Sequence, residues 1–163
     1  MAIDTGQVQD PSGRTQEVSY GWLRETSNRL ANALIAHGVG RGDRIAILLP
    51  QSPEVAAIHI AVYKLGGIAL PLATLFGVDA IAHRLQDAGA KAVVTDVQGL
   101  AKLAEIKRAP GALLGLELIL SIDGPGEGAL GFHDTLARAS ANFTPVMTTA
   151  DDPALMVYTS GTT

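Results

Sequence analysis

The feature that most limits the possible folds is a series of short apolar runs that begin at a constant interval. Runs rich in β-branched residues begin at positions 44, 68, 92 and 116, so each start lies 24 residues after the one before. These runs cover residues 44–49, 68–72, 92–95 and 116–122, and a fifth run covers 154–159. Consecutive apolar positions are typical of parallel strands that are buried on both faces. The sequence therefore predicts an α/β fold with a mostly parallel, five-stranded sheet.

The segments before and between these runs have helical periodicity. Ser52 and Pro53 suit a helix N-terminus, and the apolar residues after them are spaced three or four apart: Val55, Ile58, Val62 and Leu65. Two further stripes follow the same spacing: Leu23, Leu30 and Leu34 after a cap at Ser19, and Ile81, Leu85 and Ala88 before Gly89. Alternating strands and helices predict right-handed βαβ units with helices on both faces of the sheet. We expect a single partial domain over residues 1–163, with residues 1–18 as a lead-in that includes a short strand.

Composition excludes several classes of function. Twelve Lys and Arg stand against sixteen Asp and Glu, and no basic run occurs, so nucleic acid is not expected as a partner. The absence of cysteine excludes disulfides, cysteine-ligated zinc and a thiol nucleophile. No apolar stretch approaches the roughly 20 residues that span a bilayer. The first residues do not resemble a secretory signal, so a soluble, cytoplasmic protein is expected.

A glycine pattern in the second half of the chain suggests one alternative function. Residues 126–131 match GxGxxG, with Asp151 about 20 residues later as a candidate ribose ligand of a nicotinamide-dependent oxidoreductase. The next helix is expected only near Phe132 or His133. Residues 123–131 are therefore expected to form a plain surface loop. A dinucleotide-binding enzyme should also carry glycines after its first strand, and residues 50–53 contain none. The oxidoreductase and a non-catalytic α/β binding module remain the alternatives.

The other polar residues do not predict a metal site. The four histidines, His37, His59, His83 and His133, are scattered without an i,i+4 pair. Asp151 and Asp152 precede Pro153, which favours a solvated turn over paired metal ligands. We therefore predict no metal ligand within this sequence.

The end of the chain carries the strongest chemical signal. The last apolar run leads directly into five small or hydroxyl-bearing residues: Thr159, Ser160, Gly161, Thr162 and Thr163. Glycine lets backbone N–H groups approach an anion, and Ser and Thr add hydroxyl donors, as in a phosphate-binding loop. From composition alone, a Ser/Thr-rich turn is an equal alternative.

Residues 158–163 (YTSGTT) resemble the first six residues of [YF]TSGTTGxPKG, the phosphate-binding motif of the adenylate-forming enzymes. This family includes acyl-CoA synthetases, adenylation domains of non-ribosomal peptide synthesis and luciferases. Three earlier stretches are also similar to family elements: residues 19–23 (SYGWL), 37–44 (HGVGRGDR) and 63–72 (YKLGGIALPL). Their order and spacing make the resemblance specific from about Ser19 to Thr163.

Within the family, the stretch Leu75-Phe76-Gly77 followed by Arg84 resembles the acyl-CoA synthetase branch. Phe76 and Gly77 match a Phe-Gly-Gly that lies along the CoA path in acetyl-CoA synthetases, while Val78 replaces the second glycine. The resemblance implies CoA contact at Phe76 and Gly77. The alternative is that Phe76 only packs in the core.

The resemblance implies an enzyme that uses ATP, Mg²⁺ and CoA to convert a small-molecule carboxylate, through an acyl-adenylate, to a thioester. Residues 159–163 would hold the ATP phosphates. The sequence stops before the Gly-x-Pro-Lys-Gly that completes the motif, so it is expected to be an N-terminal piece of a longer enzyme. We expect this piece to lack catalytic residues, to be inactive alone and to self-associate through exposed apolar residues, with Met156, Val157 and Tyr158 as candidates.

Overall fold

The computed structural model describes residues 5–9, 15–109 and 111–159. It opens with an antiparallel hairpin of β1 (Thr5–Gln9) and β2 (Thr15–Ser19), in which Thr5 pairs with Ser19. The expected lead-in thus holds two strands instead of one. The predicted cap at Ser19 is confirmed, because its Oγ accepts a hydrogen bond from the Trp22 backbone N–H at 3.0 Å.

The central sheet has five strands in the order β4, β3, β5, β6, β7, and all neighbouring pairs are parallel. The strands are β3 (Arg44–Leu48), β4 (Ile68–Pro71), β5 (Ala90–Thr95), β6 (Leu118–Ser121) and β7 (Leu130–Gly131). Four of them overlap the first four predicted runs, with β5 beginning two residues before its run, and this confirms the mostly parallel α/β fold.

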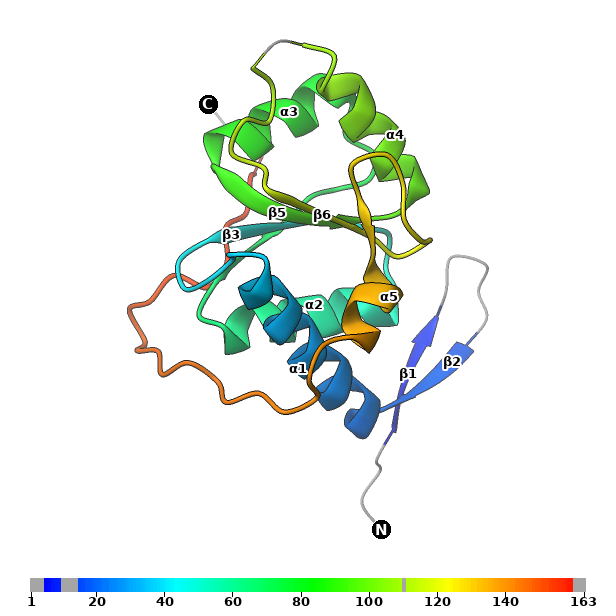
Figure 1. The fold of residues 1–163 in the computed structure, drawn as a ribbon, viewed down its shortest axis with the longest axis vertical. Coiled ribbons are helices and arrows are strands. Elements are labelled where there is room, and N and C mark those ends of the chain that lie inside the picture. The colour runs from blue at the N-terminus through cyan, green and yellow to red at the C-terminus, as the bar shows by residue number, and fades with distance from the viewer. Residues whose placement is uncertain (1–4, 10–14, 110, 160–163) are drawn as a thin grey trace.

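Helices cover both faces of this sheet, as Figure 1 shows. On one face lie α1 (Tyr20–Ala36), α2 (Pro53–Lys64) and α5 (Phe132–Ala137). On the other face lie α3 (Val78–Asp87) and α4 (Val97–Ile106). The carboxyl ends of the strands therefore open between the two helical layers, where α/β folds bind their ligands.

Alternation along the strands produces two separate hydrophobic clusters. In β3, Ile45 and Ile47 belong to the cluster under α1 and α2, whereas Ala46 and Leu48 belong to the cluster under α3 and α4. The same division repeats in β5 and β6, so these three strands bury side chains on both faces. This burial explains why the predicted runs are apolar at consecutive positions.

Besides the second strand of the hairpin, two elements were not predicted from the sequence. Helix α4 begins at an N-cap, Asp96, whose side chain accepts from the Gly99 backbone N–H at 2.8 Å. Strand β7 lies at the end of the stretch expected to be a loop. It follows a tight turn in which Gly126 and Ala129 exchange backbone hydrogen bonds. Helix α5 begins at Phe132, as expected.

The fifth predicted strand, residues 154–159, differs from expectation, because it forms only an isolated parallel bridge between Ala69 and Leu155. Ala69 donates to Ala154 O and accepts from the Met156 N–H, each at 2.9 Å. The next donor along β4 would be residue 71, which is a proline and has no N–H. The ladder therefore ends after one bridge, although the segment runs in the predicted direction.

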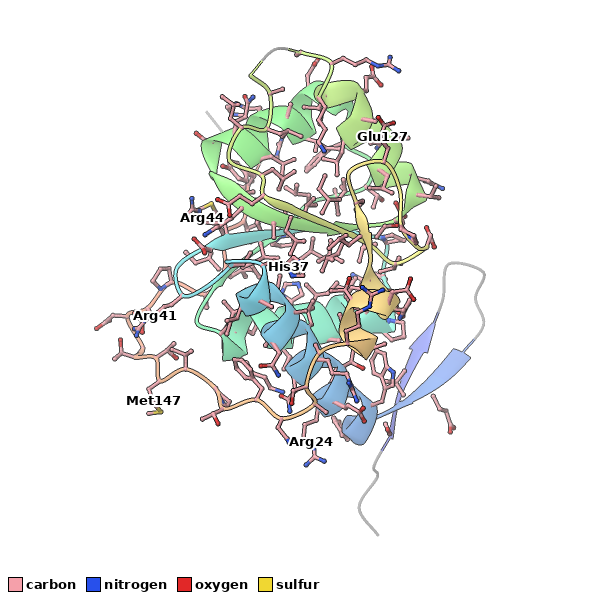
Figure 2. The ribbon with its side chains drawn as sticks, viewed as in Figure 1. Arg24, His37, Arg41, Arg44, Glu127 and Met147 are labelled. Carbon is pink, nitrogen blue, oxygen red and sulfur yellow. The ribbon has the colours of Figure 1, made fainter. Side chains whose placement is uncertain are left out.

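A long irregular segment, residues 138–154, connects α5 to this bridge and passes around α1 and α2 (Figure 1). Side chains of α1 hold its first part: Asn28 donates to Ala141 O, and Asn32 donates to Ser140 O and Asn142 O. Further along, Val146 N–H donates to Lys64 O at 2.8 Å. Figure 2 shows Met147 pointing away from the body of the molecule. These hydrogen bonds hold the segment along α1 and α2, and its last residues lie against the free edge of β4.

Candidate functional site

The site predicted for phosphate begins where the last described residues leave the β4 edge. Thr159 is described and is exposed. Ser160, Gly161, Thr162 and Thr163 lie outside the described residues. The structure thus places the entrance to the predicted loop, next to the carboxyl end of β4, and the loop itself remains a prediction.

Tyr158 fixes this entrance, because its side chain turns inward against α3. Its hydroxyl donates a hydrogen bond to Asp87 Oδ2 at 2.5 Å, and its ring packs against the cluster under α3 and α4. Partial burial and the bond to Asp87 raise the pKa of Tyr158 to about 12. The phenol is therefore neutral near pH 7 and acts as a donor. The residue before the predicted loop is anchored at one place on the helix.

Phe76 and Gly77, predicted to lie on the CoA path, follow β4 at the same edge of the sheet. Phe76 is partly buried against the cluster under α3 and α4, and its N–H donates to Ala73 O at 3.1 Å. Gly77 is the N-cap of α3 with a φ of −69°, and a Cβ there would meet nothing within 4 Å. Neither backbone strain nor crowding therefore requires glycine at position 77. Phe76 has the packing role of the alternative interpretation, and CoA contact stays a prediction.

Arg84 of α3 brings these two predicted sites together. Its guanidinium carbon lies 4.2 Å from the centre of the Phe76 ring and 5.5 Å from the centre of the Tyr158 ring. Both distances fall within the range of cation–π interaction. The sequence drew attention to Arg84 only as part of a resemblance. The spacing of Arg84 and Asp87 on one helix face is the signal that could have indicated a shared contact.

Lys102 is a second residue whose role the sequence did not reveal. Its ammonium donates to Thr74 O at 2.6 Å and to Phe76 O at 2.9 Å, so α4 holds the loop that carries Phe76. The position of Lys102 became meaningful only with α4, which was not predicted. The loop after β4 is thus fixed from two helices, by Arg84 at the ring and by Lys102 at the backbone.

The sequence candidates outside this edge have local structural contacts. Asp152 accepts from the Thr149 N–H and pairs with Arg41 at 2.8 Å, and these contacts lower its pKa. Figure 2 shows Arg41 beside the segment that contains Asp152. His37 Nδ1 lies 2.8 Å from Ala33 O. Nothing in these contacts assigns the residues a role in the chemistry.

The described residues contain neither a cluster of metal ligands nor a membrane-spanning helix. Among them, no three His, Asp or Glu side chains gather closely enough to hold a metal ion. None of the described helices is both long enough and apolar enough to cross a membrane.

Comparison with known proteins identifies relatives over almost the whole chain. Residues 3–163 match the family described as AMP-binding enzyme. An acetyl-coenzyme A synthetase of Streptomyces avermitilis is 32% identical over 93% of this chain. A dimodular nonribosomal peptide synthase of Bacillus subtilis is 34% identical over 90% of this chain, and the match covers 6% of that protein.

Solved structures agree with these relatives. The crystal structure of a Brucella canis acyl-CoA synthetase matches 99% of this chain with a TM-score of 0.85 and 33% identity. The chain spans 30% of that structure and 25% of the length of the Streptomyces protein. Its fold is therefore found within proteins three to four times longer.

Proposed function

We propose that this chain, which belongs to the AMP-binding enzyme family, is the N-terminal part of an ATP-dependent acyl-CoA synthetase. The observation that carries the proposal is the anchored entrance of the predicted phosphate loop. Tyr158 is held by α3 at the edge of the sheet, and in the sequence it is followed directly by TSGTT. Family membership favours a ligase over the oxidoreductase and the binding module that the sequence left open.

The proposed reaction has two steps. A carboxylate oxygen attacks the α-phosphorus of ATP, the bond to the β-phosphate oxygen breaks, and pyrophosphate leaves, which gives an acyl-adenylate. The CoA thiolate then attacks the acyl carbonyl carbon, and AMP leaves with the electron pair of the broken C–O bond. Mg²⁺ would accompany the ATP phosphates. A cytoplasmic location belongs to this proposal, since ATP and CoA are both available there.

In this proposal, residues 159–163 bind the β- and γ-phosphates. Their hydroxyl and N–H donors would hold the leaving pyrophosphate while negative charge builds on it. Anchoring at Tyr158 supports this role, because donors stabilise a transition state only when their positions are fixed beforehand.

The nonribosomal peptide synthase match favours a second candidate, an adenylation unit that transfers its acyl group to a thiol other than CoA. The first step is the same in both cases, and the acceptor distinguishes them. The match of Phe76 and Gly77 to the CoA-path motif supports the acyl-CoA synthetase. Formation of an acyl-CoA product by the full-length enzyme would support it, and exchange without any CoA thioester would favour the second candidate.

The test is carboxylate-dependent exchange of labelled pyrophosphate into ATP, in a full-length enzyme that carries this chain. A panel of acetate, longer alkanoates and aromatic carboxylates should include at least one that supports exchange. Thr162→Val should then slow exchange by about 10- to 1000-fold, the range expected for loss of one well-placed donor. Thr144→Val, at an exposed threonine of the irregular segment, is the matched control and should leave the rate unchanged.

Two outcomes would contradict the proposal. If none of the carboxylates supported exchange of pyrophosphate into ATP, the proposed adenylation step would be contradicted. A normal exchange rate in Thr162→Val would remove the phosphate role of the loop and leave the Ser/Thr-rich turn as its interpretation.

A further inference from the structure

Arg84 occupies a position between two segments that are far apart in the sequence. Phe76 lies in the loop after β4, and Tyr158 lies on the segment that crosses the β4 edge near the end of the chain. The guanidinium carbon of Arg84 lies 4.2 Å from one ring centre and 5.5 Å from the other. Each ring can therefore attract the same cation.

The Arg84 side chain is held by its own helix and by these rings. One terminal nitrogen, Nη1, donates to Ala80 O at 2.9 Å, one turn earlier in α3. The Nε atom is buried and has no hydrogen-bond partner among the described residues. Burial of an unpaired donor costs free energy, so the placement of this guanidinium must be offset by its other contacts. The contacts that the structure offers are the two aromatic rings.

The neighbouring residue Asp87 adds a second link from α3 to the same tyrosine. Its carboxylate accepts from the Tyr158 hydroxyl, while Arg84 lies against the ring. Both residues belong to the last turns of α3, and the N-cap of that helix, Gly77, directly follows Phe76. Helix α3 thus contacts both segments, and Arg84 is the side chain that touches both rings.

We propose that Arg84 is a positioning residue that holds the Phe76 loop and the Tyr158 segment in one fixed arrangement. This inference rests on the proposed function, in which the first segment borders the thiol acceptor and the second leads into the phosphate loop. A displacement of Arg84 moves both segments at once. Both half-reactions therefore depend on this residue, although it touches neither ATP nor CoA in this assignment.

The first experiment measures the link directly in this chain, without any assay of activity. Phe76→Leu is introduced with Arg84 intact and again with Arg84→Met, and the backbone amide NMR signals of Tyr158 and Thr159 are compared. With Arg84 present, Phe76→Leu should shift both signals. With Arg84→Met, the same change should shift them by less than half as much. Equal shifts in the two backgrounds, or none in either, would overturn the proposal.

The second experiment measures both half-reactions in a full-length enzyme that carries this chain. Arg84→Met should lower kcat for pyrophosphate exchange and for thioester formation together, by about 10- to 100-fold, since a displacement of about 1 Å can cost that much. Arg84→Lys keeps the charge without the planar group and should recover part of the loss. Arg108→Met, at an exposed arginine after α4, is the control and should match the wild type.

A purely structural role predicts a different pattern. In that case Arg84→Met would lower the melting temperature, and full kcat would return when the assay is run well below that temperature. This recovery would overturn the positioning role. An unmodified enzyme that shows no exchange with any carboxylate would contradict the proposed function only, because the NMR comparison would still decide whether Arg84 links the two segments.

Discussion

Tyr158 donates its hydroxyl hydrogen to Asp87, which joins the end of the described chain to a helix that ends 71 residues earlier. Partial burial, and then this bond to a carboxylate, raise the pKa of the Tyr158 phenol to about 12. An unfolded tyrosine has a pKa near 10. The protonated phenol therefore stabilises the folded state, and this link can be followed by its dependence on pH.

The first prediction concerns alkaline stability. Because the folded pKa of Tyr158 exceeds the unfolded one, its stabilising contribution should be complete below about pH 10 and disappear as pH rises through about 12. Denaturant unfolding at a series of pH values, with the NMR titration of the Tyr158 ring carbon, measures both quantities. Asp87→Asn should lower the pKa of Tyr158 but leave it above 10, since burial remains. Glu105→Gln, on exposed α4 surface, should not change it.

The second prediction concerns Gly99, which lies in the first turn of α4. A Cβ at this position would lie 1.8 Å from Thr95 Oγ1 and 3.1 Å from Leu48 Cδ2. The Thr95 hydroxyl is not free to move, because it donates to Leu48 O at 2.9 Å. Gly99→Ala should therefore lower the free energy of unfolding by about 1–3 kcal/mol, as expected for overpacking.

Gly21 of α1 provides the matched control for this substitution. A Cβ at Gly21 would meet only Ser19 Oγ, at 3.6 Å, which is an ordinary contact. Gly21→Ala should leave stability unchanged or raise it by up to about 1 kcal/mol through helix propensity. Equal stability of Gly99→Ala and the unmodified chain in denaturant would contradict the crowding described at α4.

The central strands were predicted well from the sequence, because a strand that is buried on both faces needs apolar residues at consecutive positions. Residues 45–49, for example, are all apolar, and they alternate between the two hydrophobic clusters. The last run shares that composition, yet its ladder ends after one bridge because Pro71 of the adjacent strand lacks an N–H. The residue that ends the ladder belongs to the adjacent strand, so the composition of the last run does not reveal that the ladder is short.

The candidate site was predictable in chemistry but not in arrangement. The hydroxyl-rich ending and the Phe76 motif are both visible in the sequence, and Tyr158, just before the ending, follows Phe76 by 82 residues. The proximity of Tyr158 to Phe76 depends on the path of residues 138–154, which is held by side chains of α1 and not by a strand ladder. For the same reason the contact of Arg84 with both rings could not be predicted, because periodicity shows which helix face a residue occupies and not what lies opposite.

The third prediction concerns nucleotide binding by these 163 residues. The chain spans about a quarter of the length of the acetyl-CoA synthetases it matches, and it carries only the first six residues of the predicted phosphate-binding motif. Titration calorimetry with Mg·ATP should therefore detect no binding tighter than about millimolar, equivalent to roughly −4 kcal/mol. Micromolar affinity would show that the chain has a self-sufficient nucleotide site.

The last prediction concerns self-association through the segment at the β4 edge. Among residues 154–159, Met156 and Tyr158 turn inward, while Leu155 and Val157 are 51% and 56% exposed. This corrects the expectation that Met156 and Tyr158 would be exposed together with Val157.

An apolar row at the free edge of a sheet tends to become covered by another chain. Light scattering should therefore show an apparent mass that rises with concentration. The double variant Leu155→Ser with Val157→Ser should reduce this rise, because it removes the apolar row without changing an inward-facing side chain. Leu114→Ser, at a leucine that is 87% exposed in the loop before β6, should have no effect. A clean monomer at high concentration would contradict self-association, and unchanged association in the double variant would place the contact elsewhere on the surface.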